Sequence, residues 1–234
     1  MTRTPLVFLP CLMGDAALWR HQLDSLGDLA EMTVADLARD DTIAGMARRV
    51  LDAAPARFAL AGLSMGGYVA QEIMRRAPER VLRLALLDTA ARADLPEQRE
   101  RRLRTIELAE RGRYADVLAE MFPLLVHPDW LADAALRQAV TQMAERVGPA
   151  GFIRQQTAIA GRPDGREDLR RVTCPTVLLY GRQDALTPAK VQEEMAANLP
   201  NARLVAIEEC GHLSALERPH AVSAVLRYWL QDRG

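Results

Sequence analysis

The chain has 234 residues, and its 30 Lys and Arg nearly balance its 31 Asp and Glu, so the formal net charge is −1 at pH 7. A near-neutral charge argues against an electrostatic nucleic-acid binder, and no apolar run approaches the ~20 residues that cross a membrane. Three cysteines without paired spacing indicate a reducing compartment. We therefore expect a cytoplasmic protein with neither a nucleic-acid nor a membrane partner, built as one α/β domain with an insertion.

Strand patterns and helical patterns alternate along the chain. The first apolar run, residues 5–13, is interrupted by Pro10 and has no convincing cleavage site, so it predicts a core strand and not a signal peptide. Strands are predicted over residues 6–9, 31–35, 57–62, 82–87, 176–181 and 202–207. Helices are predicted over residues 18–26, 42–54, 65–77, 189–198 and 219–231. This order is typical of an α/β fold with a mostly parallel, doubly wound sheet covered by helices.

Residues 90–172 interrupt the alternation and are helical in pattern, with weak strand signals throughout. An insertion at this point predicts a helical cap over the carboxyl ends of the strands. We expect a core made of residues 1–89 and 173–234, with residues 90–172 as the cap.

The most informative local pattern is Gly62-Leu63-Ser64-Met65-Gly66, a G-x-S-x-G motif between a predicted strand and a predicted helix. A serine on such a sharp turn has a strained backbone, and glycine two residues to either side leaves room for it. The turn exposes the Ser64 hydroxyl and places the Met65 N–H at a helix N-terminus, where it can bind an oxyanion. The motif therefore predicts a nucleophilic serine.

A serine hydroxyl needs a general base, and the chain has four histidines. His212 follows the predicted strand 202–207 after a short loop, at the sheet edge where catalytic groups collect in parallel α/β proteins. The others fit surface or packing roles, since they lie in a predicted helix (His21), in a mid-chain segment (His127) and at the start of the last helix (His220). We expect His212 to be the base.

The base in turn needs a carboxylate to orient it. Asp184 directly follows a predicted buried strand, and Leu186-Thr187-Pro188 then opens a helix, which suits this role. Asp88, at the end of another strand, is the alternative acid, although a turn or capping role also fits it. The chain order Ser64, Asp184, His212 matches the order expected for this kind of triad.

The second oxyanion donor is expected in the loop after the first core strand. Pro10 has no N–H and cannot donate a hydrogen bond. Leu12, two residues further on, is the best candidate, because its N–H can point back over the sheet edge. Together with Met65, it is predicted to form the oxyanion hole.

Four stretches carry these features, namely FLPCLMGDAALW (8–19), AGLSMGG (61–67), LLYGRQDALTP (178–188) and CGHLSALERP (210–219). In this order they resemble the α/β-hydrolase superfamily, and within it small esterases of the kind that includes the pimeloyl-carrier-protein methyl ester esterase. The resemblance implies a cofactor-free serine hydrolase for small-molecule esters, free or carrier-bound. Relatives usually carry glycine where this chain has Cys11, and a side chain there narrows the pocket.

Apolar side chains near the triad and in the predicted cap are expected to shape the substrate pocket; alternatively, they bind the cap to the core. These predicted pocket residues are Met13, Trp19, Phe122, Leu125, Trp130, Leu186 and Leu213.

A basic run, Arg99, Arg101, Arg102 and Arg104, is interleaved with glutamates in the predicted cap. Such a run is typical of a solvated helix face. The alternative is a docking patch for an acidic carrier protein or a carboxylated acyl chain.

Cofactor and metal patterns are absent from the sequence. Gly62-x-Ser64-x-x-Gly67 departs from a dinucleotide-binding loop at its central glycine, and no HExxH, CxxC or clustered ligand pattern occurs, so we expect neither cofactor nor metal. The leading hypothesis is hydrolysis of carboxylic esters through an acyl-enzyme. The same fold also supports a lyase of the menaquinone-pathway type, a cofactor-free perhydrolase or a non-catalytic small-ligand receptor. The sequence leaves the acyl chain, the leaving group and the oligomeric state open.

Overall fold

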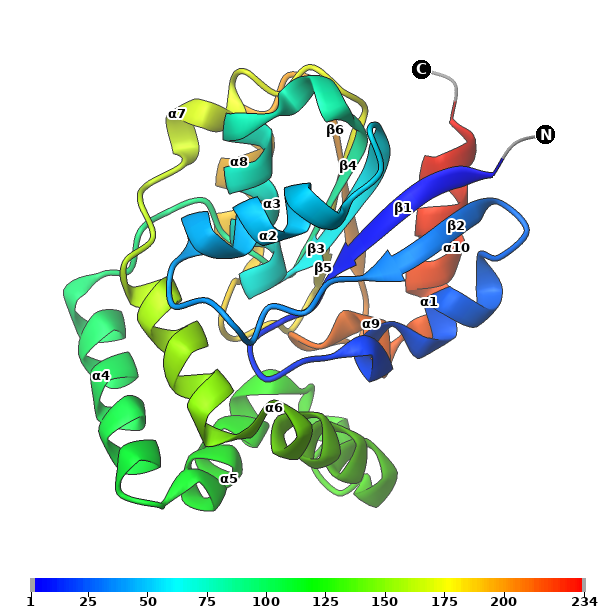
Figure 1. Ribbon diagram of the computed structural model, residues 1–234. Coiled ribbons are helices and arrows are strands. Elements are labelled where there is room, and N and C mark those ends of the chain that lie inside the picture. Colours follow the sequence, from blue (N-terminus) through cyan, green and yellow to red (C-terminus); the bar gives the residue numbers. More distant parts are fainter. Residues whose placement is uncertain (1–2, 233–234) are drawn as a thin grey trace.

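The computed structural model describes residues 3–232, in which six strands form one sheet of order β2-β1-β3-β4-β5-β6 (Figure 1). All neighbouring strands pair in parallel. The order reverses between β1 and β3, which is the switch point of a doubly wound sheet, where sites form at the carboxyl ends of the strands. This confirms the predicted fold class. The strands are β1 (Thr4–Leu9), β2 (Ala30–Val34), β3 (Phe58–Leu63), β4 (Val81–Leu87), β5 (Thr176–Gly181) and β6 (Ala202–Ile207).

Helices cover both faces of the sheet (Figure 1). On one face lie α2 (Ile43–Ala53), α3 (Met65–Arg76) and α8 (Ala189–Asn198), and on the other lie α1 (Arg20–Ser25) and α10 (Pro219–Gln231). The central strand β3 is buried along its whole length, with alternate side chains in the apolar clusters on the two faces. A strand covered on both faces is apolar throughout, which is why it is readily predicted from sequence.

The short elements that connect these layers are η1 (Ala16–Trp19), η2 (Pro78–Arg80), η3 (Pro128–Trp130), α7 (Arg166–Leu169) and α9 (Ser214–Glu217). The predicted boundaries of the strands and of the longer helices of the core agree closely with the observed ones. The helix predicted over residues 18–26 is in fact a short 3-10 turn, η1, followed by α1. Its start is set by Asp15, whose carboxylate accepts the Ala17 N–H at 2.9 Å.

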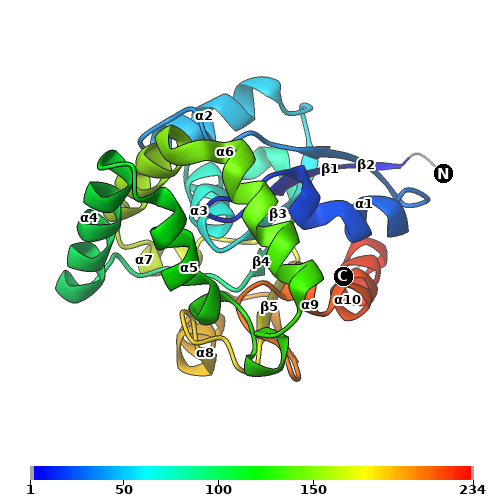
Figure 2. The same cartoon turned by 90° about the horizontal axis from the view of Figure 1, so that it is seen from below.

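Between β4 and β5 the chain leaves the sheet and forms α4 (Pro96–Glu110), α5 (Tyr114–Leu125) and α6 (Ala134–Ala160). Seen from below, α5 and α6 cross the carboxyl ends of the strands (Figure 2). α6 consists of two helical segments, because Gly148 has φ 69° and ψ 168° and Pro149 follows it. The side chains of Tyr114 in α5 and Phe152 in α6 pack against each other, with ring centroids 5.3 Å apart.

Candidate active site

Ser64 occupies the turn between β3 and α3. Its backbone has φ 55° and ψ −113°, which is strained for a residue with a side chain. The turn is also tight, since a Cβ on Gly62 would lie 2.4 Å from the Gly66 carbonyl oxygen, and one on Gly66 would lie 2.1 Å from that of Leu9. Both glycines of the motif are therefore required by close approach of the backbone.

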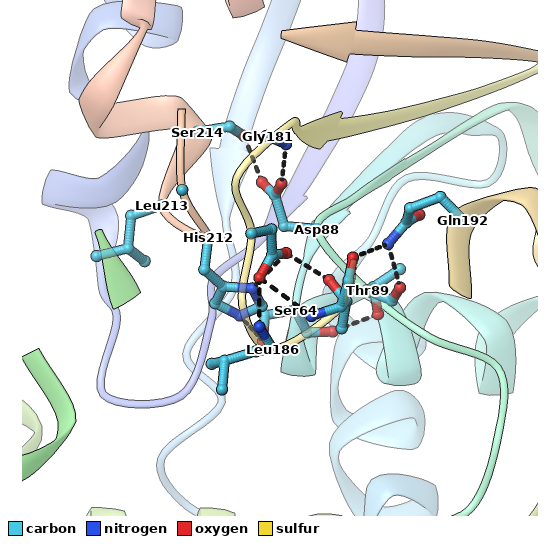
Figure 3. A network of polar contacts seen from close by, with 12 residues as sticks. Ser64, Asp88, Thr89, Gly181, Leu186, Gln192, His212, Leu213 and Ser214 are labelled. Carbon is cyan, nitrogen blue, oxygen red and sulfur yellow. Dashed lines mark hydrogen bonds and ion pairs between the residues drawn. The ribbon is translucent and has the colours of Figure 1, made fainter. Parts of the chain in front are cut away.

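Ser64, His212 and Asp184 meet at the carboxyl ends of β3, β6 and β5. His212 Nε2 lies 2.8 Å from Ser64 Oγ, and His212 Nδ1 lies 2.8 Å from Asp184 Oδ2. Figure 3 shows the imidazole ring beside Ser64. Because an ionised carboxylate only accepts hydrogen bonds, Nδ1 donates to Asp184 and Nε2 is left to accept the Ser64 proton. The three side chains thus form one hydrogen-bonded chain.

Asp184 is 2% exposed, and its carboxylate has further donors besides His212. Oδ1 accepts the backbone N–H groups of Leu186 at 2.8 Å and Thr187 at 3.0 Å, and Oδ2 accepts the Thr187 hydroxyl. Burial alone raises the pKa of Asp184, but the His212 charge and these hydrogen bonds outweigh burial and hold the pKa below its ordinary value. Asp184 therefore stays ionised at neutral pH and orients the imidazole ring.

Asp88, the alternative acid, is fully buried nearby but bonds to other partners. It accepts the Gly181 N–H at 2.8 Å and the Ser214 hydroxyl (Figure 3). Burial, and next the charge of Asp184, raise the pKa of Asp88 well above its ordinary value. Both ring nitrogens of His212 are taken by Ser64 and Asp184, so Asp88 braces the adjoining loops and does not orient the ring.

The pKa of His212 is raised above its ordinary value. Burial by itself lowers this pKa, but the negative charge and hydrogen bond of Asp184 outweigh burial, with smaller contributions from Asp88 and Glu217. The site therefore stabilises the imidazolium that forms when His212 takes a proton.

Glu217 in α9 holds the loop that carries His212, and the sequence analysis did not identify it. Glu217 is 4% exposed, and its carboxylate accepts three backbone N–H groups at 2.7–3.0 Å, those of His127, Gly211 and Leu213. The sequence feature that could have identified Glu217 is a glutamate five residues after His212, where the loop meets a short helix.

One predicted oxyanion donor, Leu12, lies in the loop after β1, and the other, Met65, is the first residue of α3, directly after Ser64. Within residues 3–232, neither the Leu12 nor the Met65 amide N–H has a protein acceptor. The adjacent Met13 N–H, by contrast, donates to Gln155 Oε1 of α6 at 2.9 Å. Gln155, another residue that sequence reasoning missed, thus fixes the loop after β1 and leaves the Leu12 amide available to a ligand oxygen.

A cavity of about 370 Å³ opens beside Ser64 and His212. Cys11 contributes to its wall, where the resemblance led us to expect a glycine. Its lining includes Leu12 and four of the predicted pocket residues, Met13, Leu125, Leu186 and Leu213.

The other three predicted pocket residues lie outside this lining. Trp19 is fully buried and stacks on Phe8 with ring centroids 4.5 Å apart. Phe122 is 3% exposed within the apolar core, and Trp130 is half-buried beside the Arg218 guanidinium. Apolar patterning identifies side chains that are buried, but not whether they are buried against protein or against a cavity.

The basic run in α4 divides between the pocket and the outer surface. Arg101, Arg102 and Arg104 line the cavity, whereas Arg99 is exposed and lies outside the lining. The cavity wall is therefore cationic on the side that α4 provides.

The described residues show no sign of three other features, a metal site, a membrane-spanning helix and a disulfide. In residues 3–232 no group of three or more His, Cys, Asp or Glu side chains is arranged to hold a metal ion. No helix in the same range is long and apolar enough to cross a membrane. The cysteines Cys11, Cys174 and Cys210 are free.

Comparison with known proteins agrees with this architecture. The model of the "alpha/beta hydrolase fold" family matches residues 35–219. A putative carbamate hydrolase, RutD, of Azorhizobium caulinodans is 32% identical over 95% of this chain and 89% of its own length. A pimeloyl-[acyl-carrier protein] methyl ester esterase of Nitrosomonas europaea is 31% identical over 87% of this chain and 86% of its own.

Among solved structures, a malate-bound thermophilic esterase from Thermogutta terrifontis superposes with a TM-score of 0.90 at 30% identity, over 98% of this chain and 90% of that one. The family match, the esterase relatives and the parallel sheet lead to one conclusion. The chain belongs to the alpha/beta hydrolase fold family, and within it resembles the small carboxylesterases of the group that contains the pimeloyl-[acyl-carrier protein] methyl ester esterases.

Proposed function

We propose that the protein is a serine hydrolase that cleaves carboxylic esters through an acyl-enzyme, with Ser64 as nucleophile, His212 as general base and Asp184 as the orienting acid. The observation that carries this proposal is the continuous run of hydrogen bonds from Ser64 Oγ through His212 to Asp184, at 2.8 Å and 2.8 Å. Its location in a cavity lined by apolar side chains supports a small organic substrate.

In the first half-reaction, His212 Nε2 takes the Ser64 proton as Oγ forms a bond to the ester carbonyl carbon. The carbonyl electron pair moves onto oxygen, and the Leu12 and Met65 amides bind the resulting oxyanion. When the tetrahedral intermediate collapses, the bond to the alcohol oxygen breaks, and His212 gives its proton to the departing alcohol. The Asp184 carboxylate stabilises the transient imidazolium.

In the second half-reaction, His212 takes a proton from water as the water oxygen attacks the acyl carbon. Collapse of this intermediate breaks the bond to Ser64 Oγ, which recovers its proton from His212. The products are a carboxylic acid and an alcohol, and no cofactor takes part.

We further propose that residues 1–89 and 173–234 form the catalytic core and that residues 90–172 form a cap that shapes the pocket. The position of α5 and α6 across the strand ends supports this division. So do Met121, Leu124 and Leu125, which bring apolar side chains of α5 to the cavity wall. The free cysteines are consistent with a cytoplasmic enzyme acting on small esters, free or carrier-bound.

The experiment is a burst assay with 4-nitrophenyl esters of increasing acyl length. We expect wild type to release nitrophenolate in an initial burst, and Ser64→Ala to lose the burst and about 10⁴-fold or more in kcat. A fluorophosphonate should add once to the wild type and not to Ser64→Ala, as judged by intact mass. The matched control is Ser25→Ala, on α1 outside the pocket lining, which keeps both the burst and the adduct. Equal labelling of Ser64→Ala and wild type would refute the nucleophile.

One observation favours a second candidate, a lyase of the menaquinone-pathway type. Its substrate carries several carboxylates, and arginines line the cavity. In such a lyase Ser64 or His212 acts as a base and no acyl-enzyme forms. Mass analysis of enzyme quenched during ester turnover distinguishes the hydrolase from the lyase. An acyl adduct on Ser64 supports the hydrolase, whereas the absence of both the adduct and the burst supports the lyase.

A further inference from the structure

The cavity lining carries more positive than negative charge. Among the residues that line it, five carry a guanidinium and two carry a carboxylate, Asp94 and Glu120. The five arginines are Arg92, Arg101, Arg102, Arg104 and Arg162. The same cavity contains Ser64 and His212, so this charge faces the space in which a substrate would bind.

Two of these arginines share a single buried carboxylate. The Asp94 side chain is 2% exposed and pairs with Arg102 at 2.6 Å and with Arg162 at 2.7 Å. Burial raises the pKa of Asp94, but the hydrogen bonds and charges of the two arginines outweigh burial and lower it, so Asp94 is ionised at neutral pH. Two guanidinium charges against one carboxylate leave one positive charge at the cavity wall.

These two arginines are fixed in place by neutral groups as well. Arg102 donates to Gln156 Oε1 at 2.8 Å. Arg162, whose side chain is 7% exposed, donates to the Arg92 carbonyl at 3.0 Å and lies over the Tyr68 ring at 4.3 Å. The excess charge is therefore preorganised, which lowers the cost of binding an anion.

Arg101 differs from the other pocket arginines. Arg92 pairs with Glu194 at 2.5 Å and Arg104 with Glu120 at 3.2 Å. Across the part of the chain that the structure describes, Arg101 has neither a carboxylate nor a carbonyl partner, although it lies in the cavity lining one residue before Arg102. A guanidinium has five N–H donors, and when no protein group accepts their hydrogen bonds it is suited to bind a carboxylate or phosphate of a ligand.

We propose that this wall, with Arg101 as its unpaired cation, binds an anionic group carried by the substrate. The inference rests on the proposed ester hydrolysis and specifies its substrate class, namely esters that bear a carboxylate or phosphate group away from the scissile bond. Apolar residues such as Leu124, Leu125 and Leu213 line the same cavity and would contact a short hydrocarbon segment between the two groups. A neutral ester of equal length lacks the anchoring charge.

The test compares three esters of the same length, the mono-4-nitrophenyl esters of adipic acid and of adipic acid monoamide, and the 4-nitrophenyl ester of 5-phosphonopentanoic acid. The readout is selectivity, the ratio of kcat/KM for an anionic ester to that for the neutral amide. We expect Arg101→Gln to lower this ratio by about tenfold through KM, since a charge-assisted hydrogen bond is lost. Arg101→Lys should keep part of the ratio. The two anionic esters show whether carboxylate or phosphate is preferred.

Arg99→Gln is the matched control, because Arg99 lies on the same helix, is also exposed and is outside the lining. It should leave the ratio at the wild-type value. The inference is overturned if Arg101→Gln leaves the ratio unchanged or if Arg99→Gln lowers it equally. Failure of the proposed function looks different, since wild type would then hydrolyse none of the three esters.

Discussion

The carbonyl oxygen of Leu125 accepts the backbone N–H of His212 at 3.0 Å, and it also accepts that of Leu213 at 3.1 Å. Leu125 is the last residue of α5, whereas His212 belongs to the loop after β6. The end of a helix that lies across the strand ends is therefore bonded directly to the loop that presents the imidazole ring. A displacement of α5 would move the His212 loop, so the packing of residues 90–172 and the geometry of the Ser64–His212 pair are coupled.

Glu217 should be important for stability because it is the common acceptor in the His212 loop. Glu217→Ala leaves three backbone N–H groups without their acceptor, and we expect it to lower the free energy of unfolding by about 2–4 kcal/mol. The measurement is urea unfolding followed by circular dichroism. The control is Glu208→Ala, at an exposed position after β6, which should change stability by less than about 0.5 kcal/mol. Equal effects of the two variants would contradict the bracing role.

The two buried aspartates should differ sharply in catalysis. Asp184→Asn removes the acceptor that selects the His212 tautomer and should lower kcat by about 10³–10⁴-fold. Asp88→Asn keeps an oxygen that accepts the Gly181 N–H, and its amide N–H2 can donate to the Ser214 hydroxyl oxygen, so it should lower kcat by less than about tenfold. Steady-state hydrolysis of a 4-nitrophenyl ester gives both values. If Asp88→Asn is the more damaging change, the assignment of the acid is reversed.

The pH dependence should report the raised pKa of His212. The base acts only when neutral, so kcat/KM should fall as pH drops through this pKa, with the midpoint above the ordinary value of 6.5. Asp184→Asn removes a negative charge that favours the imidazolium, so the midpoint should move to lower pH. Rates read at the isosbestic wavelength of nitrophenol avoid interference from the product. A wild-type midpoint below 6.5 would contradict the electrostatic argument.

The elbow should not tolerate a side chain at Gly66. A Cβ there would lie 2.1 Å from the Leu9 carbonyl oxygen, so Gly66→Ala must displace α3 or β1. We expect a loss of about 3 kcal/mol or more in the free energy of unfolding, measured by urea denaturation. Gly27→Ala is the control, since its Cβ would meet its nearest neighbour at 3.9 Å, and it should cost less than about 1 kcal/mol. A stable, active Gly66→Ala would refute the close-packing argument.

Features that depend on a few consecutive residues were predictable. The boundaries of β5, β6, α8 and α10 match the predicted ranges, because buried parallel strands are continuous apolar runs and the helices between them have their own start and stop signals. Ser64 was recognisable because the strand, the glycines and the helix that impose its turn are adjacent in the chain.

Local patterns do not specify contacts between residues that are distant in sequence. Trp19 and Phe122 are apolar in the expected positions, yet they pack against protein and not the cavity. Gln155 contacts Met13 across 142 residues, and no local pattern marks such a bond.

The sequence alone determined the parallel sheet, the serine turn and a short set of histidines and aspartates at strand ends, since each is encoded by neighbouring residues. Only the tertiary structure decided which aspartate reaches His212 and which arginine of the cavity lining remains without a carboxylate partner in the described chain. Those outcomes depend on the direction of side chains at the ends of separate strands and helices. That direction is set by packing between segments that are far apart in the chain.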